Sequence, residues 1–376
     1  MNLSIAFVTE TYPPEINGVA MTVGRLVEGL RLRGHQVSIV RPRQHSGDQG
    51  NEGDVAVRGL PLPGYPSLRF GLPAGGRLRR HWRESRPDLV HVVTEGPLGW
   101  SAVNAARHLG IPVTSGFHTN FDRYSVHYGV GWMRPAISAY LRALHRRACA
   151  TMVPTAALAA DLAGEGIPCV RVVGRGVDTR LFDPQCRSEE LRAEWKCSPE
   201  TLVCLSVGRM APEKNLSLVC RAFDSIRAAR PDARMVWVGD GPARKQLAQS
   251  RPADIFAGMR IGEELAQHYA SADLFLFPSL SETYGNVVPE AMASGVAALA
   301  YRSAAAAEVI VDGECGRTVP PGDETAFVAA ALELAADDQG RRQIAANARA
   351  AILPRDWESV VASLESVMRE AKRSRP

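Results

Sequence analysis

The same order of segments opens both halves of the chain: an apolar run of strand length, a loop, a helical pattern and another apolar run. The first half begins this order with residues 3–8, and the second with residues 202–207. Apolar residues then recur at helical spacing over residues 19–30 and 216–223. Alternation of this kind is typical of parallel sheets covered by helices, with ligands at the carboxyl ends of the strands. We therefore predict an α/β protein with two Rossmann-like, doubly wound domains.

The length and composition fit this architecture. A chain of 376 residues is long enough for two domains of ordinary size. It is 45% hydrophobic and 22% charged, and its longest apolar stretches are strand-sized, so no membrane-spanning helix is expected. The first eight residues have the pattern of a strand rather than a signal peptide, and the seven cysteines form no C-x-x-C pair. We expect a cytoplasmic protein with reduced thiols and no zinc site.

Charge is distributed unevenly along the chain. Through Val170 there are eighteen arginines, no lysine and twelve acidic residues, so this part carries +6, while the whole chain carries +4. An arginine-rich half favours an anionic partner, either a phosphorylated compound or a lipid surface. The alternative is a solvated basic face that reflects a GC-rich genome. The small net charge and the absence of a recognised motif argue against nucleic acid as a partner.

Residues 277–295 combine the end of a buried strand, a polar turn and a short helix that stops at Gly295. Gly285 and Asn286 give the turn the backbone freedom that a close approach by a ligand requires. The free N–H groups at the start of the helix, near Val287, can hold an anion such as a diphosphate. We interpret this stretch as an anion site.

Two carboxylates, Glu282 and Glu290, flank this anion site. Carboxylates repel phosphates, but they accept hydrogen bonds from hydroxyl groups. A nucleotide sugar carries hydroxyls on both sides of its diphosphate, on the ribose and on the sugar ring. The alternative is that Glu282 caps the helix and Glu290 is an exposed helical residue.

The pair Glu282 and Glu290, with seven residues between them and Ala-Met-Ala-Ser-Gly after them, resembles the E-x7-E signature of retaining GT-B glycosyltransferases of family 4. Residues 208–215, G-R-M-A-P-E-K-N, are similar to the family motif G-R-x-x-x-E-K-N. The resemblance extends over nearly the whole chain and implies two Rossmann-like domains that face a central cleft. Residues 1–174 with 355–376 would bind the acceptor, and residues 175–354 the nucleotide sugar.

The resemblance also implies roles for individual residues. Arg209 and Lys214 follow a strand end, where two cations can neutralise a diphosphate, and no D-x-D motif is present to hold a metal. No cofactor and no metal are therefore expected. By similarity, Glu282 binds hydroxyls of the donor sugar and Glu290 those of the ribose. The expected catalytic residues are His118, Arg209, Lys214 and Glu282, and the expected donor-binding residues are Gly18, Met259, Tyr284, Gly285, Asn286, Val287 and Glu290.

Some of these assignments have structural alternatives. A lone histidine such as His118 is more often structural than catalytic, and the turn at Gly18 is a simple connection in the alternative interpretation. Residues 303–307, one serine and four alanines, stand where the common family pattern has two glycines before Glu308. This departure puts a local backbone contact in doubt.

Residues 124–148 mix aromatic, apolar and basic side chains, with an apolar stripe at helical spacing. One interpretation is an amphipathic face that touches an anionic membrane on its inner side and admits a lipid acceptor. The other is a core-packed helix with a basic outer face. The segment resembles family members that glycosylate membrane lipids, of the mannosyl-, glucosyl- or sulfoquinovosyl-transferase type. The expected acceptor-binding residues are Tyr12, Asn120, Tyr124 and Trp132.

The sequence thus predicts a retaining glycosyltransferase that moves a hexose from GDP-mannose or a UDP-hexose to a hydroxyl acceptor such as diacylglycerol or a glycolipid. The resemblance implies front-face attack, in which the leaving phosphate takes the acceptor proton and no residue is a covalent nucleophile. The open alternatives are a soluble or polysaccharide acceptor, an epimerase or phosphorylase of the same fold, and a non-catalytic protein that binds nucleotide sugars.

Overall fold

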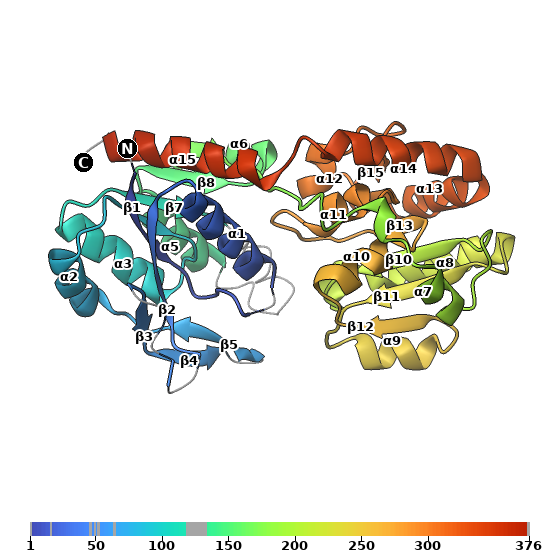
Figure 1. Cartoon of the computed structure of the whole chain (residues 1–376), viewed down its shortest axis with the longest axis horizontal. Helices are drawn as coiled ribbons and strands as arrows, with labels where there is room; N and C mark the ends of the chain where they lie inside the picture. Colours follow the sequence, from blue (N-terminus) through green and yellow to red (C-terminus); the bar gives the residue numbers. More distant parts are fainter. Residues whose placement is uncertain are drawn as a thin grey trace. The chain divides into compact units, whose positions relative to one another are not determined.

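The computed structural model describes residues 2–15, 17–44, 47–48, 50, 53–62, 65–117 and 134–373, with the backbone alone at 62, 65–68 and 134. The chain divides into two compact units, Met1–Gly176 with Trp357–Pro376, and Val177–Asp356. Each boundary lies two residues beyond the expected one. Each unit contains a parallel sheet covered by helices (Figure 1). The predicted α/β class with two doubly wound domains is confirmed.

The first unit is built on a sheet of seven strands, within the described residues, in the order β3-β2-β1-β6-β7-β8-β9. Its strands are β1 (Ser4–Val8), β2 (Gln36–Pro42), β3 (Val55–Val57), β6 (Leu89–Val92), β7 (Val113–Gly116), β8 (Ala150–Val153) and β9 (Val170–Val172). Its helices are α1 (Gly18–Leu32), α2 (Gly75–Glu84), α3 (Pro97–His108), α5 (Arg134–His145), α6 (Ala156–Gly164) and α15 (Trp357–Arg373). Strands β4 (Gly59–Leu62) and β5 (Tyr65–Gly71) form a separate antiparallel pair.

Helix α15 belongs to the first unit although it is the last helix of the chain, and it packs against α1. A Cβ atom at Gly29 of α1 would lie only 2.5 Å from Val361 Cγ2, so the glycine permits this close approach. Glu365 of α15 also accepts a 2.7 Å hydrogen bond from Arg33 Nε. The apolar side of α15 is buried in the core of this unit, at Val360, Val361, Leu364, Val367, Met368 and Ala371.

The second unit is built on a sheet of six strands, within the described residues, in the order β12-β11-β10-β13-β14-β15. Its strands are β10 (Val203–Val207), β11 (Arg234–Val238), β12 (Ile255–Gly258), β13 (Leu274–Phe277), β14 (Ala297–Tyr301) and β15 (Arg317–Val319). Its helices are α7 (Glu189–Glu194), α8 (Leu216–Ala229), α9 (Arg244–Ser250), α10 (Gly262–Ala270), α11 (Val287–Ala293), α12 (Ala304–Val309), α13 (Glu324–Ala336) and α14 (Asp338–Ile352). The short 3-10 helices η2 (Pro184–Cys186) and η3 (Pro212–Lys214) complete it.

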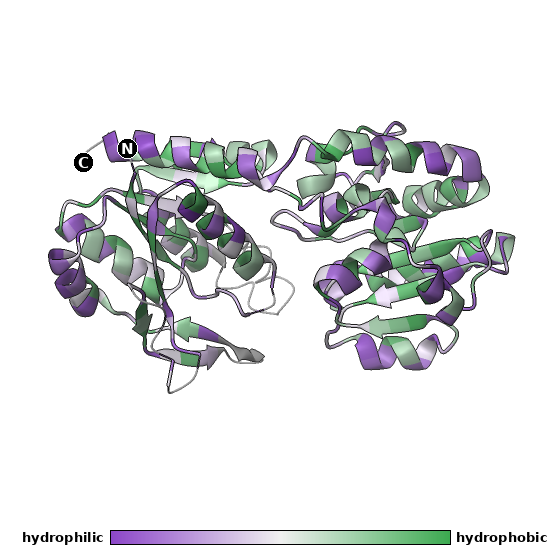
Figure 2. Ribbon diagram, in the orientation of Figure 1, coloured by the Kyte–Doolittle hydropathy of each residue, from purple (hydrophilic) through white to green (hydrophobic). Residues whose placement is uncertain are grey.

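The strands of both sheets are mainly hydrophobic, while hydrophilic residues gather on helices such as α2 and α9 (Figure 2). All five residues of β10 and all four of β13 are buried. Continuous burial is expected for parallel strands that have helices on both faces. Because the two strands pair in parallel, with Leu205 opposite Phe275, the loops that follow them emerge at the same edge of the sheet.

Glycines allow these loops to pack closely. Gly239, after β11, has a φ of +126°, and a Cβ atom there would lie 2.0 Å from the carbonyl oxygen of Gly208, after β10. Only glycine fits this position. The amide of Gly208 donates to Val238 O at 3.0 Å, and that of Gly239 donates to Gly258 O at 2.8 Å. The carboxyl ends of β10, β11 and β12 therefore form one backbone-bonded edge.

Candidate functional site

The loops after β10 and β13 in the second unit bring together charged residues that the sequence analysis selected. The loop after β10 carries Arg209 and runs through η3 to Lys214, and the loop after β13 carries Glu282. The amide of Leu280 donates to Glu213 O at 2.9 Å, which joins the two loops directly. The site is thus built on the adjacent ends of two paired strands.

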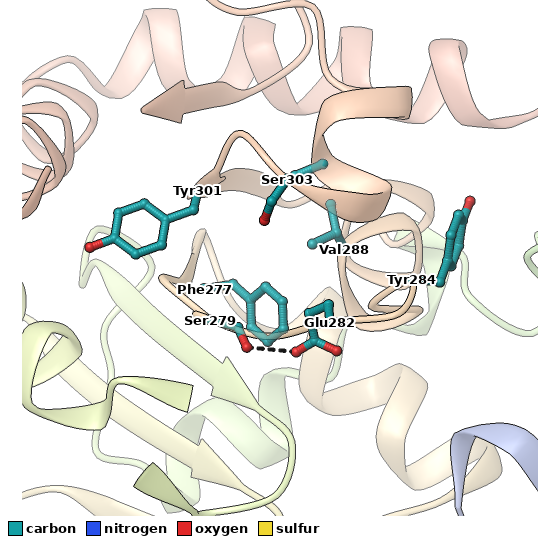
Figure 3. Close-up of a pocket in the computed structure, with 8 residues that line it drawn as sticks. Phe277, Ser279, Glu282, Tyr284, Val288, Tyr301 and Ser303 are labelled. Atoms are coloured by element: carbon teal, nitrogen blue, oxygen red, sulfur yellow. Dashed lines mark hydrogen bonds between the residues drawn. The ribbon is translucent and has the colours of Figure 1, made fainter. Parts of the chain in front are cut away.

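Lys214 and Glu282 are in direct contact. The Lys214 ammonium forms an ion pair with Glu282 Oε1, and the side chains are 16% and 14% exposed. Ser279 Oγ donates to the same carboxylate oxygen at 2.7 Å (Figure 3). The Lys214 Nζ atom also lies 5.5 Å from the centroid of the Phe277 ring, within cation–π range. The pair is largely shielded from water, which strengthens its electrostatic interaction.

Arg209 has a carboxylate partner that the sequence analysis missed. Its Nη2 atom forms an ion pair with Glu213 Oε1, four residues later, and Glu213 is 1% exposed. The second carboxylate oxygen of Glu213 has no hydrogen-bond partner among the described residues. Burying an unpaired carboxylate costs free energy, so the ion pair with Arg209 stabilises Glu213 in its buried position. The i, i+4 spacing was the available signal for this contact.

The turn between β13 and α11 has the backbone geometry that its sequence predicts. Gly285 has a φ of +86°, in the left-handed region, and Asn286 is the N-terminal cap of α11, which has seven residues. Tyr284 is buried, and its carbonyl oxygen accepts a 2.7 Å hydrogen bond from the amide of Ala305 at the start of α12. The turn is therefore anchored to the start of α12, the helix that follows β14.

Glu290, in the middle of α11, is half-buried and not the exposed residue of the alternative interpretation. Its Oε2 atom accepts a 3.1 Å hydrogen bond from the hydroxyl of Tyr269 on α10. Burial raises the pKa of the Glu290 carboxyl to about 7, and the tyrosine hydrogen bond acts in the opposite direction. Near neutral pH this carboxyl therefore exists in both protonation states.

A depression of about 200 Å³ opens beside Glu282, between the ends of β13 and β14 (Figure 3). This volume includes space that is open to solvent, so the depression does not enclose a whole drug-sized ligand. Ala304, at its border, has a φ of +48°, which is unusual for a residue other than glycine. The lining residues are Phe277, Ser279, Glu282, Tyr284, Val288, Tyr301, Ser303 and Ala306.

Of the remaining predicted residues, those that the structure describes lie outside the cluster around Lys214 and Glu282. Met259 follows β12 at the same edge of the second sheet and is 55% exposed. Gly18 is the first residue of α1 in the first unit, after the cap Asn17, whose Oδ1 accepts a 2.9 Å hydrogen bond from the amide of Ala20. Tyr12 is half-buried against the core of the first unit, and burial raises the pKa of its hydroxyl. His118, Asn120, Tyr124 and Trp132 lie outside the described residues.

Helix α5 uses its apolar stripe for packing. Leu141 and Leu144 are buried, and Leu144 belongs to a core cluster of the first unit. Tyr140 stacks on Trp100 with 5.1 Å between ring centroids, and its hydroxyl donates to Glu95 O at 2.7 Å. This end of the apolar stripe therefore packs against the core of the first unit, as the core-packed interpretation expects.

The described residues contain neither a membrane-spanning helix nor a cluster of metal ligands. None of the helices there is long and apolar enough to pass through a bilayer. In the same part of the chain, no group of three or more histidine, cysteine, aspartate or glutamate side chains is arranged to hold a metal ion.

Known proteins match the chain over most of its length. Residues 16–181 match the model of Glycosyltransferase Family 4, and residues 201–337 match that of Glycosyl transferases group 1. The chain is 36% identical over 366 residues to the GDP-mannose-dependent alpha-mannosyltransferase of Mycolicibacterium smegmatis, which covers 95% of each chain. It is 28% identical over 314 residues to the alpha-monoglucosyldiacylglycerol synthase of Streptococcus pneumoniae, which covers 80% of this chain and 71% of the other.

Solved structures show the same fold. Anabaena HepE, solved in complex with UDP, has a TM-score of 0.76 and 18% identity, and the match covers 98% of this chain and 100% of that one. The two matched family models and the similarity to the mycobacterial enzyme over nearly the full length show that this chain belongs to glycosyltransferase family 4 and is a glycosyltransferase with the GT-B fold.

Proposed function

We propose that this glycosyltransferase transfers mannose from GDP-mannose, with retention of configuration, to a hydroxyl group of a membrane lipid. The observation that carries the proposal is the cluster at one edge of the second sheet, where Lys214 contacts Glu282 and Arg209 follows the adjacent strand. The cations suit a diphosphate, and the carboxylate suits the hydroxyl groups of the sugar bonded to it. The donor is supported by the name of the M. smegmatis relative, and a lipid acceptor by that of the S. pneumoniae relative.

Arg209 and Lys214 would stabilise the negative charge that grows on the leaving diphosphate. Fixed positive groups in a shielded site supply several kcal/mol of such stabilisation, because they need no reorganisation during the reaction. They provide the charge that a divalent cation provides in other enzymes, so we propose that transfer requires no metal. When the donor binds, the Lys214 ammonium would contact the phosphate while the Glu282 carboxylate accepts hydrogen bonds from sugar hydroxyls.

The rest of the donor would extend along the same sheet edge. Glu290 would accept hydrogen bonds from the ribose hydroxyls, and Met259, which is exposed after β12, would lie beside the base. Gly285, Asn286 and Tyr284 would shape the turn around the phosphates. For Gly18 and His118 of the first unit, a contact with the donor is proposed from the family resemblance alone.

The reaction would proceed on one face of the sugar. The acceptor hydroxyl oxygen forms a bond to the anomeric carbon while the bond from that carbon to the diphosphate breaks. The acceptor proton passes to the leaving diphosphate, so the products are GDP and an α-mannoside. No side chain forms a covalent intermediate in this scheme.

The acceptor would bind in the first unit while that unit contacts the membrane surface peripherally, on its inner face. Support comes from the excess of arginine through Val170 and from exposed arginines on α2, at positions 77, 80 and 83. Each arginine near an anionic bilayer contributes about 1 kcal/mol of attraction. Tyr12 and the segment that contains Asn120, Tyr124 and Trp132 are the proposed acceptor contacts.

Turnover assays test these statements separately. Purified protein is given GDP-mannose or UDP-glucose, with diacylglycerol in anionic vesicles or with soluble sugars as acceptors. We expect an α-mannosyl lipid, identified by its anomeric NMR signal, at a rate that EDTA leaves largely unchanged. Transfer only to soluble sugars would contradict the lipid acceptor, and a β-linked product would contradict retention. Loss of transfer in EDTA, restored by a divalent cation, would contradict metal independence.

A further inference from the structure

Tyr269 on α10 is a buried residue to which the proposed reaction gives no role. Its hydroxyl donates a hydrogen bond to Glu290 Oε2 at 3.1 Å, from 21 residues earlier in the chain. Glu290 is the proposed ribose contact, so the inference rests on the proposed function. We propose that Tyr269 is a positioning residue for the nucleotide site: its hydroxyl orients the Glu290 carboxylate and favours the ionised form, which accepts hydrogen bonds from both ribose hydroxyls.

The ring of Tyr269 is held in place by aromatic neighbours. The residue is 0% exposed, and its ring meets Phe182 edge-on, with 5.7 Å between centroids and an interplanar angle of 85°. A second edge contact joins it to Phe275 of β13, at 5.9 Å and 65°. Interiors packed at this density leave a side chain little freedom. The position of the tyrosine oxygen is therefore fixed, and its hydrogen bond holds the Glu290 carboxylate beside it.

The backbone of α11, which carries Glu290, is anchored independently of Tyr269. Arg349 of α14 donates to Ala293 O, at the end of α11, at 2.7 Å. Pro184 packs against Gly295, where a Cβ atom would lie 2.8 Å from Pro184 Cγ. The helix would therefore keep its place if the tyrosine hydroxyl were removed, and the loss would act on the Glu290 side chain.

No other charged group on the elements packed against α11, within the described residues, takes the place of the Tyr269 hydroxyl at Glu290. These groups either have other partners or carry a negative charge themselves. Arg349 on α14 pairs with Asp183 Oδ2 at 2.5 Å and donates to backbone carbonyls. His268 on α10 uses Nδ1 for Glu264 O, at 2.6 Å. Glu308 on α12 carries the same charge as Glu290. Within the described residues, the Glu290 carboxylate accepts its side-chain hydrogen bond from Tyr269.

The consequence is a specific dependence on pH. With a raised pKa of about 7, the Glu290 carboxyl is ionised above neutrality and gains a proton as the pH falls. A carboxylate that loses such a hydrogen bond becomes easier to protonate, so without the Tyr269 hydroxyl the pKa of Glu290 should rise further, by roughly one pH unit. If only the ionised form binds ribose, Tyr269→Phe weakens donor binding about eightfold at pH 6.5 and less than about twofold at pH 9.

The test is the affinity for GDP-mannose, measured by calorimetric titration from pH 6 to pH 9 on wild type and Tyr269→Phe. Both phosphates of GDP-mannose are diesters with no proton to gain in this range, and loss of the guanine N1 proton near pH 9 affects both proteins alike. A pH-dependent difference in affinity between the two proteins therefore belongs to the protein. Phenylalanine keeps the ring contacts with Phe182 and Phe275, and thermal unfolding confirms that the variant is folded. We expect the affinity of Tyr269→Phe for GDP-mannose to be clearly lower than that of wild type at low pH and nearly equal to it at high pH.

Two further variants isolate the effect. Glu290→Gln cannot ionise, so adding Tyr269→Phe to it should introduce no pH-dependent loss. Tyr140→Phe removes a partly buried hydrogen bond of a tyrosine hydroxyl in the first unit, to Glu95 O, and should leave the affinity and its pH profile unchanged. A Tyr269→Phe affinity ratio that is constant from pH 6 to 9 would overturn this inference alone. Failure of the wild-type protein to bind GDP-mannose would overturn the proposed donor as well.

Discussion

Replacing Lys214 with methionine separates its role in the reaction from its role in the fold. Methionine keeps an unbranched apolar stem beside Phe277 but removes the ammonium that pairs with Glu282. Breaking a fully buried ion pair costs about 3–5 kcal/mol. Here both side chains retain some exposure, and Ser279 still donates to Glu282 at 2.7 Å. We therefore expect the free energy of unfolding to fall by about 1–3 kcal/mol.

The effect on transfer should be larger than the effect on stability. Removing one preorganised donor from a developing anion lowers kcat by about a hundredfold to a thousandfold. Initial rates with saturating GDP-mannose measure this loss, and urea unfolding measures stability. In the double variant Lys214→Met/Glu282→Gln no unpaired buried charge remains, so stability should recover by about 1–2 kcal/mol while transfer stays low.

A control with the same chemistry is Lys245→Met on α9, which is exposed and should leave both measurements unchanged. Transfer by Lys214→Met within about threefold of wild type would refute the role of the ammonium at the leaving diphosphate. Equal stability of the single and double variants would refute the shielded ion pair on which the magnitude depends.

Three other positions allow further tests. Ala304 has a φ of +48°, so Ala304→Gly should raise the free energy of unfolding by about 0.5–1 kcal/mol in urea; a decrease would contradict the left-handed backbone there. Gly239→Ala places a Cβ atom 2.0 Å from Gly208 O and should cost about 3 kcal/mol or more, and a loss below about 1 kcal/mol would contradict the close packing of the two loops. Glu213→Gln removes the charge that pairs with Arg209 and should lower transfer by about tenfold or more, with the fold checked by circular dichroism; unchanged transfer would dismiss Glu213 as a functional partner.

The strand and helix order was predictable from the sequence because apolar periodicity reports burial directly. The run before Pro278 forms β13, and the small residues before Gly295 form α11. The stripe on α5 had two interpretations, because periodicity shows which side of a helix is apolar but not what covers it. The packing of Leu144 in the core accounts for the buried end of the stripe.

Contacts between distant residues were not predictable in the same way. Lys214 and Glu282 are separated by 68 residues, and their contact follows from the pairing of β10 with β13. No local pattern links Tyr269 to Glu290, because the hydrogen bond depends on how α10 and α11 pack. The contact between Glu213 and Arg209 was easier to predict, because their spacing is that of an i, i+4 ion pair.

The central claim is that Arg209 and Lys214 hold the diphosphate of a nucleotide sugar. Calorimetric titration of GDP-mannose and of guanosine into wild type, Arg209→Met and Lys214→Met tests it most directly. Each variant should lose at least about tenfold in affinity for GDP-mannose and keep its affinity for guanosine, which has no phosphate. Unchanged affinity for GDP-mannose in both variants, or equal losses for both ligands, would contradict the claim.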